Sequence, residues 1–185
     1  LFFSDTIGSN LTFVGNTAGR GGAVGNYAGT QSLRNVTIFD NTATSSGQGP
    51  LYASTGGDTA VTNAILWGNH GDELVGPSGG AAVEITGAIV EGGCPVQSGL
   101  TCSAVVNADP QLDATAQNHG GFVPTLAIPQ ESPAVDAAPA AGCASNDARG
   151  VERPFDVGGD GGNTCDFGAY EFVPLPALDI ELEAG

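Results

Sequence analysis

Three aligned segments decide the fold of this chain: NLTFVGN (10–16), NVTIFDN (35–41) and NAILWGN (63–69). Each begins and ends on asparagine and holds a short apolar run. A weaker fourth copy, GAIVEGG (87–93), has glycine in place of both asparagines. The copies start at positions 10, 35, 63 and 87, so they are 25, 28 and 24 residues apart, a spacing typical of repeat proteins. One copy is too short to bury a core alone, so we expect the copies to stack.

The residues around these copies favour strands and tight turns, because glycine, asparagine, threonine and β-branched residues are common there. The apolar positions alternate with Thr12, Thr37 and Ile65, the period of a half-buried strand. One coil per repeat predicts an all-β fold, a right-handed parallel β-helix with three short strands per coil and an irregular C-terminal cap. Two internal stacks are expected, Leu11, Val36, Ala64 and Ala88 in one and Phe13, Ile38, Leu66 and Val90 in the other.

The asparagines that close the copies, Asn16, Asn41 and Asn69, predict a ladder at one corner of the coils. Stacked side-chain amides can hydrogen-bond from one rung to the next. The alternative is that each asparagine acts independently as a turn residue that tolerates positive φ.

An apolar stripe is expected on the outside of the coils. Val14, Phe39 and Trp67 each follow a core position by one residue, so they point outward and align with one another. Such a stripe is either covered by a loop or contacts a partner. A sugar-stacking row is the less favoured alternative.

Four cysteines form two local pairs, Cys94 with Cys102 and Cys143 with Cys165. An even count in a glycine-rich chain favours disulfides and an oxidising compartment. The pairs have seven and twenty-one intervening residues, whereas paired zinc ligands usually have about two. A four-thiolate zinc site and free thiols remain as alternatives.

The charge of the chain limits its partners. Twenty acidic residues face four arginines and no lysine, for a net charge of −16. This charge argues against nucleic-acid binding and against docking on anionic membranes. No apolar run is long enough to insert directly into a bilayer. The chain starts at Leu1 and contains no methionine, so we expect a trimmed piece of a longer precursor with further coils before it.

The segment TFVGNTAGRGGA (12–23) resembles the repeats of polymorphic outer-membrane proteins. Five later blocks resemble, in order, the choice-of-anchor Q domain that closes β-helices on bacterial exported proteins: DPQL (109–112), HGGFVPTLAI (119–128), SPAVDAA (132–138), DARGVERP (147–154) and CDFGAYE (165–171). The resemblance implies coils over 1–104, a cap continuous with them over 105–172, and an extended exit segment over 173–185. It also implies an extracellular, periplasmic or surface-anchored location.

The cap is expected to close the open end of the last coil, which would otherwise expose unpaired backbone and apolar side chains. The apolar residues expected to cover that end are Ile128, Val135, Phe155, Phe167 and Tyr170. Charge-assisted hydrogen bonds are expected to hold the loops of the cap together. The residues expected to make them are Asp136, Asp147, Arg149, Arg153, Asp166 and Glu171.

A calcium site is the one cofactor that the sequence suggests. The segment DVGGDGGNTCD (156–166) places oxygen ligands of the kind calcium prefers at Asp156, Asp160, Asn163 and Asp166. The alternative is that these residues form turns and bond to Arg149 or Arg153.

Signals of catalysis are weak. Asp72 and Glu73 are neighbours, so along a strand they would face opposite sides, and His70 and His119 lie in glycine-flanked turns as locally bonded residues. We therefore predict a non-catalytic structural or adhesive protein of the cell surface, with another extracellular protein or a surface glycan as partner. The alternatives are a polysaccharide lyase or glycoside hydrolase, whose active residues lie in other coils, and a carbohydrate-binding module.

Overall fold

The computed structural model describes residues 5–159 and 161–174. Its strands wind into a parallel β-helix, as predicted. The largest sheet has the order β1-β4-β7-β8-β9, and every neighbouring pair is parallel. Its strands are β1 (Thr6–Val14), β4 (Gly29–Phe39), β7 (Gly57–Trp67), β8 (Val83–Val90) and β9 (Leu100–Val106).

Two small parallel sheets complete the first two coils. One pairs β2 (Thr17–Ala18) with β5 (Thr42–Ala43), and the other pairs β3 (Val24–Asn26) with β6 (Leu51–Ala53). These two coils therefore have the predicted further strands. In the described part of the chain, the later coils have strands only in the large sheet.

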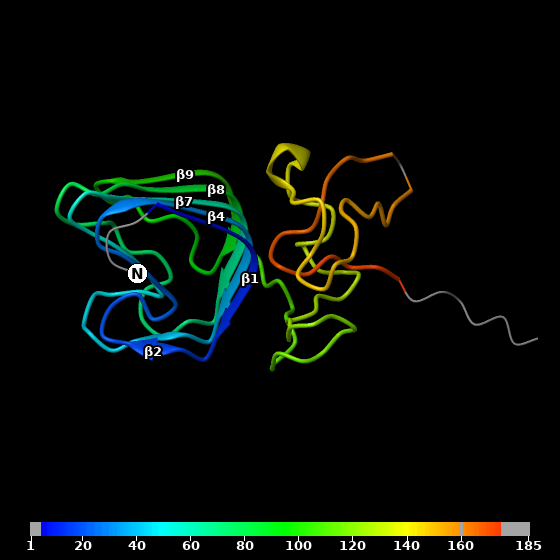
Figure 1. Cartoon of the computed structure of the whole chain (residues 1–185), viewed down its shortest axis with the longest axis horizontal. Helices are drawn as coiled ribbons and strands as arrows, with labels where there is room; N and C mark the ends of the chain where they lie inside the picture. The colour runs from blue at the N-terminus through cyan, green and yellow to red at the C-terminus, as the bar shows by residue number, and fades with distance from the viewer. Residues whose placement is uncertain (1–4, 160, 175–185) are drawn as a thin grey trace, which may run out of the picture.

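Each long strand bends where a copy begins, so the large sheet turns a corner (Figure 1). Asn10, Asn35 and Asn63 have φ of 56°, 50° and 53°, and Gly87 continues this row with φ of 63°. Asparagine tolerates this left-handed conformation better than most residues, and glycine adopts it freely. The chain before the bend and the chain after it therefore belong to one continuous strand in each coil.

The predicted internal stacks are confirmed by the register of the sheet. Leu11 pairs with Val36, Val36 with Ala64, and Ala64 with Ala88. The second stack follows the same register through Phe13, Ile38, Leu66 and Val90. Val36, Ala64 and Leu66 have no exposed surface, so the core lies inside the coils.

The tail after β9 lies beside the large sheet (Figure 1). It consists of irregular loops and one short 3-10 helix, η1 (Ala140–Gly142). A second apolar cluster joins Ile65 and Ile89, on the outer face of the sheet, to Ile128 and Phe167 of the tail. The expectation that the tail covers the open end of the last coil is therefore wrong. Two isoleucines at outward-facing positions need cover, and the tail supplies it.

In the described part of the chain, no helix is long and apolar enough to span a membrane.

Candidate functional site

The closing asparagines form the predicted ladder. Asn16 donates its side-chain amide to Asn41 Oδ1 at 2.9 Å, and Asn41 donates to Asn69 Oδ1 at 3.0 Å. The same oxygens accept the main-chain N–H of Asn16 at 3.1 Å and of Asn41 at 2.9 Å. Asn41 is fully buried, so these bonds satisfy groups that water cannot reach.

Glu73 ends the ladder, and the sequence analysis missed this role. Asn69 donates its main-chain N–H to Glu73 Oε1 and its side-chain amide to Glu73 Oε2, both at 2.7 Å. Burial, with the nearby Glu91 carboxyl as a smaller cause, raises the pKa of Glu73 to about 7, against the two bonds from Asn69, which lower it. Because Gly93 replaces the asparagine of the fourth copy, the ladder needs an acceptor from elsewhere. The missing asparagine at position 93 was the feature of the sequence that could have indicated such an acceptor.

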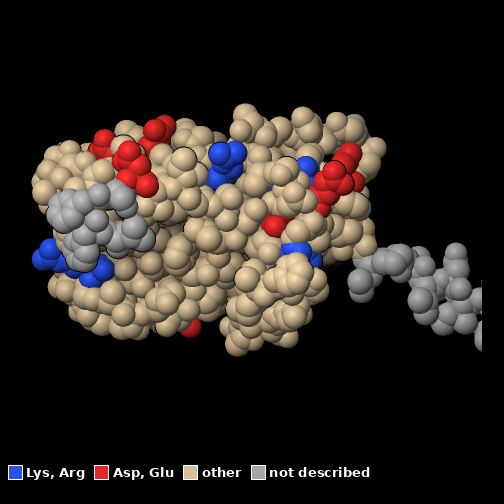
Figure 2. Space-filling view, viewed as in Figure 1, with Lys and Arg blue, Asp and Glu red and all other residues tan. Residues whose placement is uncertain are grey.

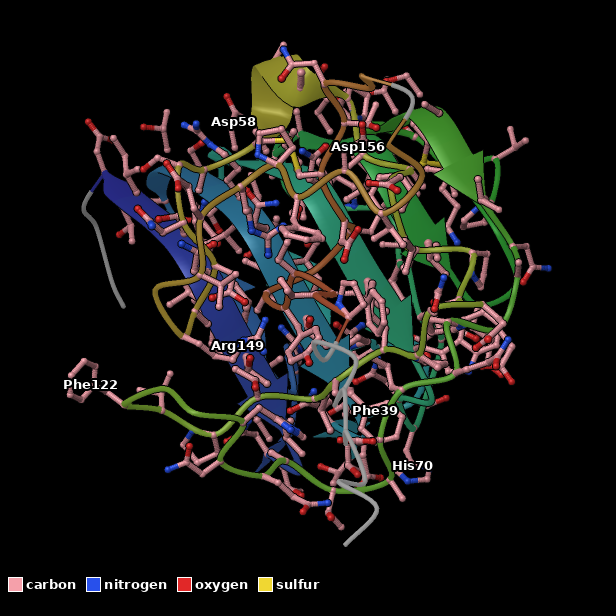
Figure 3. All side chains as sticks on the ribbon, turned by 90° about the vertical axis from the view of Figure 1, so that its right-hand side faces the viewer. Phe39, Asp58, His70, Phe122, Arg149 and Asp156 are labelled. Carbon is pink, nitrogen blue, oxygen red and sulfur yellow. A yellow bond between two sulfur atoms is a disulfide. The ribbon has the colours of Figure 1, made fainter. Side chains whose placement is uncertain are left out.

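The opening asparagines have a different role, because they bind the tail. Asn35 Oδ1 accepts the main-chain N–H of Ala144 at 2.9 Å. Asn10 donates its side-chain amide to the carbonyl of Asn146 at 2.7 Å. The main-chain carbonyl of Asn63 accepts the N–H of Gly168 at 3.1 Å. Figure 3 shows the tail crossing in front of the strands of the large sheet.

A buried network of charges holds the loops of the tail together, at the residues predicted for it. Arg153 forms an ion pair with Glu171 at 3.0 Å, and neither side chain has exposed surface. Arg153 also donates to the carbonyls of Asp166 and Gly168, each at 2.9 Å. Glu171 accepts the main-chain N–H of Asp166 at 3.0 Å. The network therefore ties the segment around Arg153 to the segment that contacts the sheet.

Asp147 organises a second part of this network. Its carboxylate forms an ion pair with Arg149 at 2.7 Å and accepts the main-chain N–H of Glu171 at 3.0 Å. The guanidinium of Arg149 lies 3.6 Å from the centre of the Tyr170 ring. His119 lies edge-on to the same ring, 5.6 Å between ring centres. A hollow of about 760 Å³ opens here, another feature that the sequence analysis missed.

The two predicted disulfides are present, Cys94–Cys102 and Cys143–Cys165. Cys165 is fully buried in the cluster between sheet and tail. The second disulfide thus joins η1's C-terminal neighbour Cys143 to the segment that lies on the sheet.

Two of the four predicted calcium ligands, Asp156 and Asp166, have other bonds in the structure. Asp156 accepts the main-chain N–H groups of Gly159 and Gly161, each at 2.7 Å. Asp166 is fully buried and accepts the N–H of Asp136 at 2.8 Å. Asn163 is exposed, and Asp160 lies outside the described residues. Over 5–159 and 161–174, no group of three or more His, Cys, Asp or Glu side chains is placed to hold a metal ion. Calcium stays a prediction.

The outer stripe is aligned as predicted, since Val14 pairs with Phe39 and Phe39 with Trp67. All three residues are half-buried. Trp67 packs against the apolar cluster under the tail, so the chain itself covers part of the stripe. Figure 3 shows Phe39 at the side of the sheet where the tail crosses. Contact of the stripe with a partner stays a prediction.

A shallow hollow of about 530 Å³ lies on the other arm of the bent sheet, on the outer face before the corner. Three carboxylates from different coils line it, Asp5, Asp58 and Glu84. Asp5 Oδ1 accepts the N–H of Thr30, and Asp58 Oδ1 accepts the N–H of Ala82, both at 3.0 Å. Figure 2 shows acidic side chains gathered on the coil part of the molecule. The hollow is thus rich in hydrogen-bond acceptors.

The two histidines have nearby carboxylates. His70 Nε2 lies 3.0 Å from Asp40 Oδ1, on an exposed turn. His119 Nε2 lies 3.0 Å from Asp113 Oδ2. The partner of His70 comes from the preceding coil, 30 residues away along the chain, so this contact is not the local bond within a turn that the sequence analysis expected.

Comparison of the chain with family models, curated proteins and solved structures finds no match. The class of protein therefore follows from the structure itself. It is a disulfide-bonded parallel β-helix protein whose C-terminal tail is folded along one side of the coils.

Proposed function

We propose that this protein is a non-catalytic, exported β-helix protein with a structural or adhesive role in an extracellular or cell-surface assembly. One observation carries the proposal: its buried charged side chains hold the fold together, within the tail and within the coils. Arg153, Glu171 and Asp147 all bond to groups within the tail, and Glu73 bonds to the asparagine ladder. Two disulfides add covalent links of the kind that persist in oxidising compartments. These features favour a rigid unit that presents a surface.

The exposed hollow beside Asp5, Asp58 and Glu84 is the surface we assign to a partner. Asp58 and Glu84 are exposed, and the parallel strands beneath them are fixed by the core. An ionised carboxylate can accept hydrogen bonds but cannot donate them, so the surface favours a partner rich in hydrogen-bond donors. Another extracellular protein or a hydroxyl-bearing surface glycan fits this requirement. An anionic glycan would be repelled by the net charge of −16.

The resemblance of the tail to the choice-of-anchor Q domain supports an exported protein, as does the resemblance of the first repeat to those of polymorphic outer-membrane proteins. Both assignments are part of the proposal. They are consistent with a parallel β-helix that has an irregular segment after its last strand.

A second candidate is a polysaccharide-acting enzyme or a carbohydrate-binding module. The observation that favours it is the placement of carboxylates from several coils around one hollow. Turnover of a glycan would support the enzyme, and saturable binding without product would support the module.

The test is to isolate the protein gently from its native surface and identify what is bound to it. A stoichiometric protein partner supports the assembly role. The variant Asp58→Asn with Glu84→Gln is expected to lose the partner. A matched control is Asp109→Asn with Glu131→Gln, which removes the same number of charges from exposed positions on the tail.

The variant Phe39→Ala, isolated in the same way, tests whether the outer stripe contacts the partner. Incubation of the purified protein with neutral and anionic polysaccharides tests for catalysis. Release of new chain ends by the purified protein would contradict a non-catalytic role. A monomer that binds neither protein nor glycan would contradict the adhesive role. Equal loss of the partner in the control variant would show that general charge, and not the hollow, attracts it.

A further inference from the structure

Glu73 and Glu91 come from different turns and meet at the end of the asparagine ladder. Glu73 follows β7, is 9% exposed, and has both carboxyl oxygens in bonds from Asn69. Glu91 directly follows β8, and its Oε2 accepts the main-chain N–H of Gly68 at 2.8 Å. Gly68 and Asn69 are consecutive residues, and both glutamates line one hollow, so the carboxyl groups that accept their N–H groups lie beside each other.

Two neighbouring carboxyl groups, one of them buried, bind a proton more readily than either group would alone. If both were ionised, two oxygens of like charge would face each other, so one group stays protonated to a higher pH. Burial, with the Glu91 carboxyl as a further cause, raises the pKa of Glu73 to about 7. The shared proton is therefore held at neutral and lower pH and lost at higher pH.

Among the described residues that line the hollow around this pair, there is no basic side chain to offset its charge. The pair lines a hollow of about 470 Å³ between the turn after β7 and the turn after β8. The titratable side chains in this described lining are Asp72, Glu73 and Glu91, all of them acidic. The remaining lining is formed by Asn69, Gly71, Leu74, Gly92, Gly93, Pro95 and Gln97. Loss of the proton thus leaves uncompensated repulsion.

The segment that carries Glu73 has few other bonds to the body of the protein. Leu74 is buried in the core cluster. At the start of the segment, His70 donates its N–H to the carbonyl of Asn41 at 2.7 Å, accepts the N–H of Ala43 at 3.1 Å, and has its ring Nε2 3.0 Å from Asp40 Oδ1. Gly76 donates its N–H to Gln97 Oε1. Glu73 and Glu91 face the same hollow from this segment and from the turn at Glu91.

We propose that a proton shared by Glu73 and Glu91 acts as a latch between the loop 70–76 and the turn 91–93, which opens as the pH rises above neutral. In the closed form, Glu73 completes the ladder and Leu74 stays in the core. In the open form, the two carboxylates separate, and the hollow between the turns widens. The ladder then loses the acceptor at its end.

The test uses the intact chain and two signals between pH 5.5 and 8.5. NMR of the ¹³C-labelled carboxyl of Glu73 reports its titration. Amide hydrogen exchange of Gly68 and Asn69, corrected for the intrinsic pH dependence of exchange, reports the latch. We expect protection of these amides to fall at least tenfold across this range, with the midpoint where the Glu73 carboxyl titrates.

The variant Glu91→Gln separates a latch from a merely structural contact. The side-chain amide that this substitution introduces can accept from Gly68 and donate permanently to the Glu73 carboxylate, so protection is expected to stay high at every pH. Glu84→Gln, also on the last two coils but at the other hollow, is the control and should leave the pH dependence of protection at Gly68 and Asn69 as in the parent chain. Constant protection in the parent chain would overturn the proposal, as would titration of Glu73 near pH 4.5 or an equal effect of Glu84→Gln.

Discussion

Ala169 donates its main-chain N–H to Thr37 Oγ1 at 3.0 Å, although 132 residues separate them. Thr37 lies on the outer face of β4 and is only 1% exposed. A strand residue that the alternating pattern assigns to solvent is therefore covered by the tail. The tail is joined to the coils by this bond, by the bond from the Gly168 N–H to the Asn63 carbonyl, and by one apolar cluster. We therefore expect the coils and the tail to unfold as one cooperative unit.

Gly168→Ala is expected to separate the tail from the sheet. Gly168 has φ of +89°, and an added Cβ would lie 2.7 Å from Thr37 Oγ1 and 2.9 Å from Ile65 Cδ1. Left-handed backbone and a steric clash together should cost about 2–4 kcal/mol of unfolding free energy, measured by urea denaturation.

Gly150→Ala is the matched control for this change. Gly150 has φ of +90°, and its added Cβ would meet nothing within 4 Å, so only the backbone cost of about 1–2 kcal/mol applies. Equal losses in the two variants would show that the contact of Gly168 with the sheet adds nothing.

Asn41→Ala is expected to break the ladder at its centre. The side-chain amide of Asn41 donates to the carbonyls of Phe13 and Phe39 as well as to Asn69. Its removal leaves several buried groups without partners and should cost about 2–4 kcal/mol in thermal or urea unfolding. Asn16→Ala removes the exposed end of the ladder and should cost about 1 kcal/mol. Losses of similar size would favour independent turn residues over a ladder.

Arg153→Met is expected to destabilise the protein by about 3–5 kcal/mol, because it leaves Glu171 buried without its ion-pair partner. The control is Arg34→Met on the exposed outer face of β4, which should change unfolding free energy by less than about 0.5 kcal/mol. Calorimetry of both variants measures the difference. A small loss in Arg153→Met would mean that the Glu171 carboxyl is neutral in the native state.

The protein is expected to become more stable as the pH falls from 8 to 5. Burial and the adjacent Glu171 raise the pKa of Asp166 to about 7, although main-chain N–H bonds and Arg153 oppose the rise. A raised pKa means that the folded state binds the proton more tightly than the unfolded state. The resulting stability is fully present below about pH 4, the ordinary range of an aspartate, and is lost as the pH rises through 7.

The gain between pH 8 and pH 5 should be on the order of 2 kcal/mol for this one group. Urea midpoints at each pH measure it, and Asp166→Asn should reduce the dependence and leave the part that comes from Glu73. Asp109→Asn, at an exposed position, should leave it unchanged. A urea midpoint that is lower at pH 5 than at pH 8 would contradict the expected direction of the pH dependence.

The coils could be predicted because their signal is local and repeated. The spacing of Asn16, Asn41 and Asn69 determines which residues meet in the sheet, so the stacks and the ladder followed from the sequence. The pairing of the cysteines followed from their proximity along the chain. Charged groups in the tail, such as Arg153 and Glu171, could also be named, because arginine is scarce here and buried charges need partners.

The placement of the tail could not be predicted in the same way. It depends on contacts over long sequence separations, such as those of Asn35 with Ala144 and Thr37 with Ala169, for which no repeat provides a register. Ile65 and Ile89 did carry a signal, since both are apolar at outward-facing positions. The meeting of Glu73 with Glu91 was missed because it depends on how two turns fold back toward each other.

The most direct test of this account is native-state amide hydrogen exchange of Gly168 and Ala169, compared with strand β7 at increasing urea concentrations. If the tail is fixed to the sheet, both amides should be protected and should merge with the global unfolding of β7 as urea increases. If they exchange as fast as amides of the exposed loop around Phe122 while β7 stays protected, the tail is not part of the folded unit, and the central claim is contradicted.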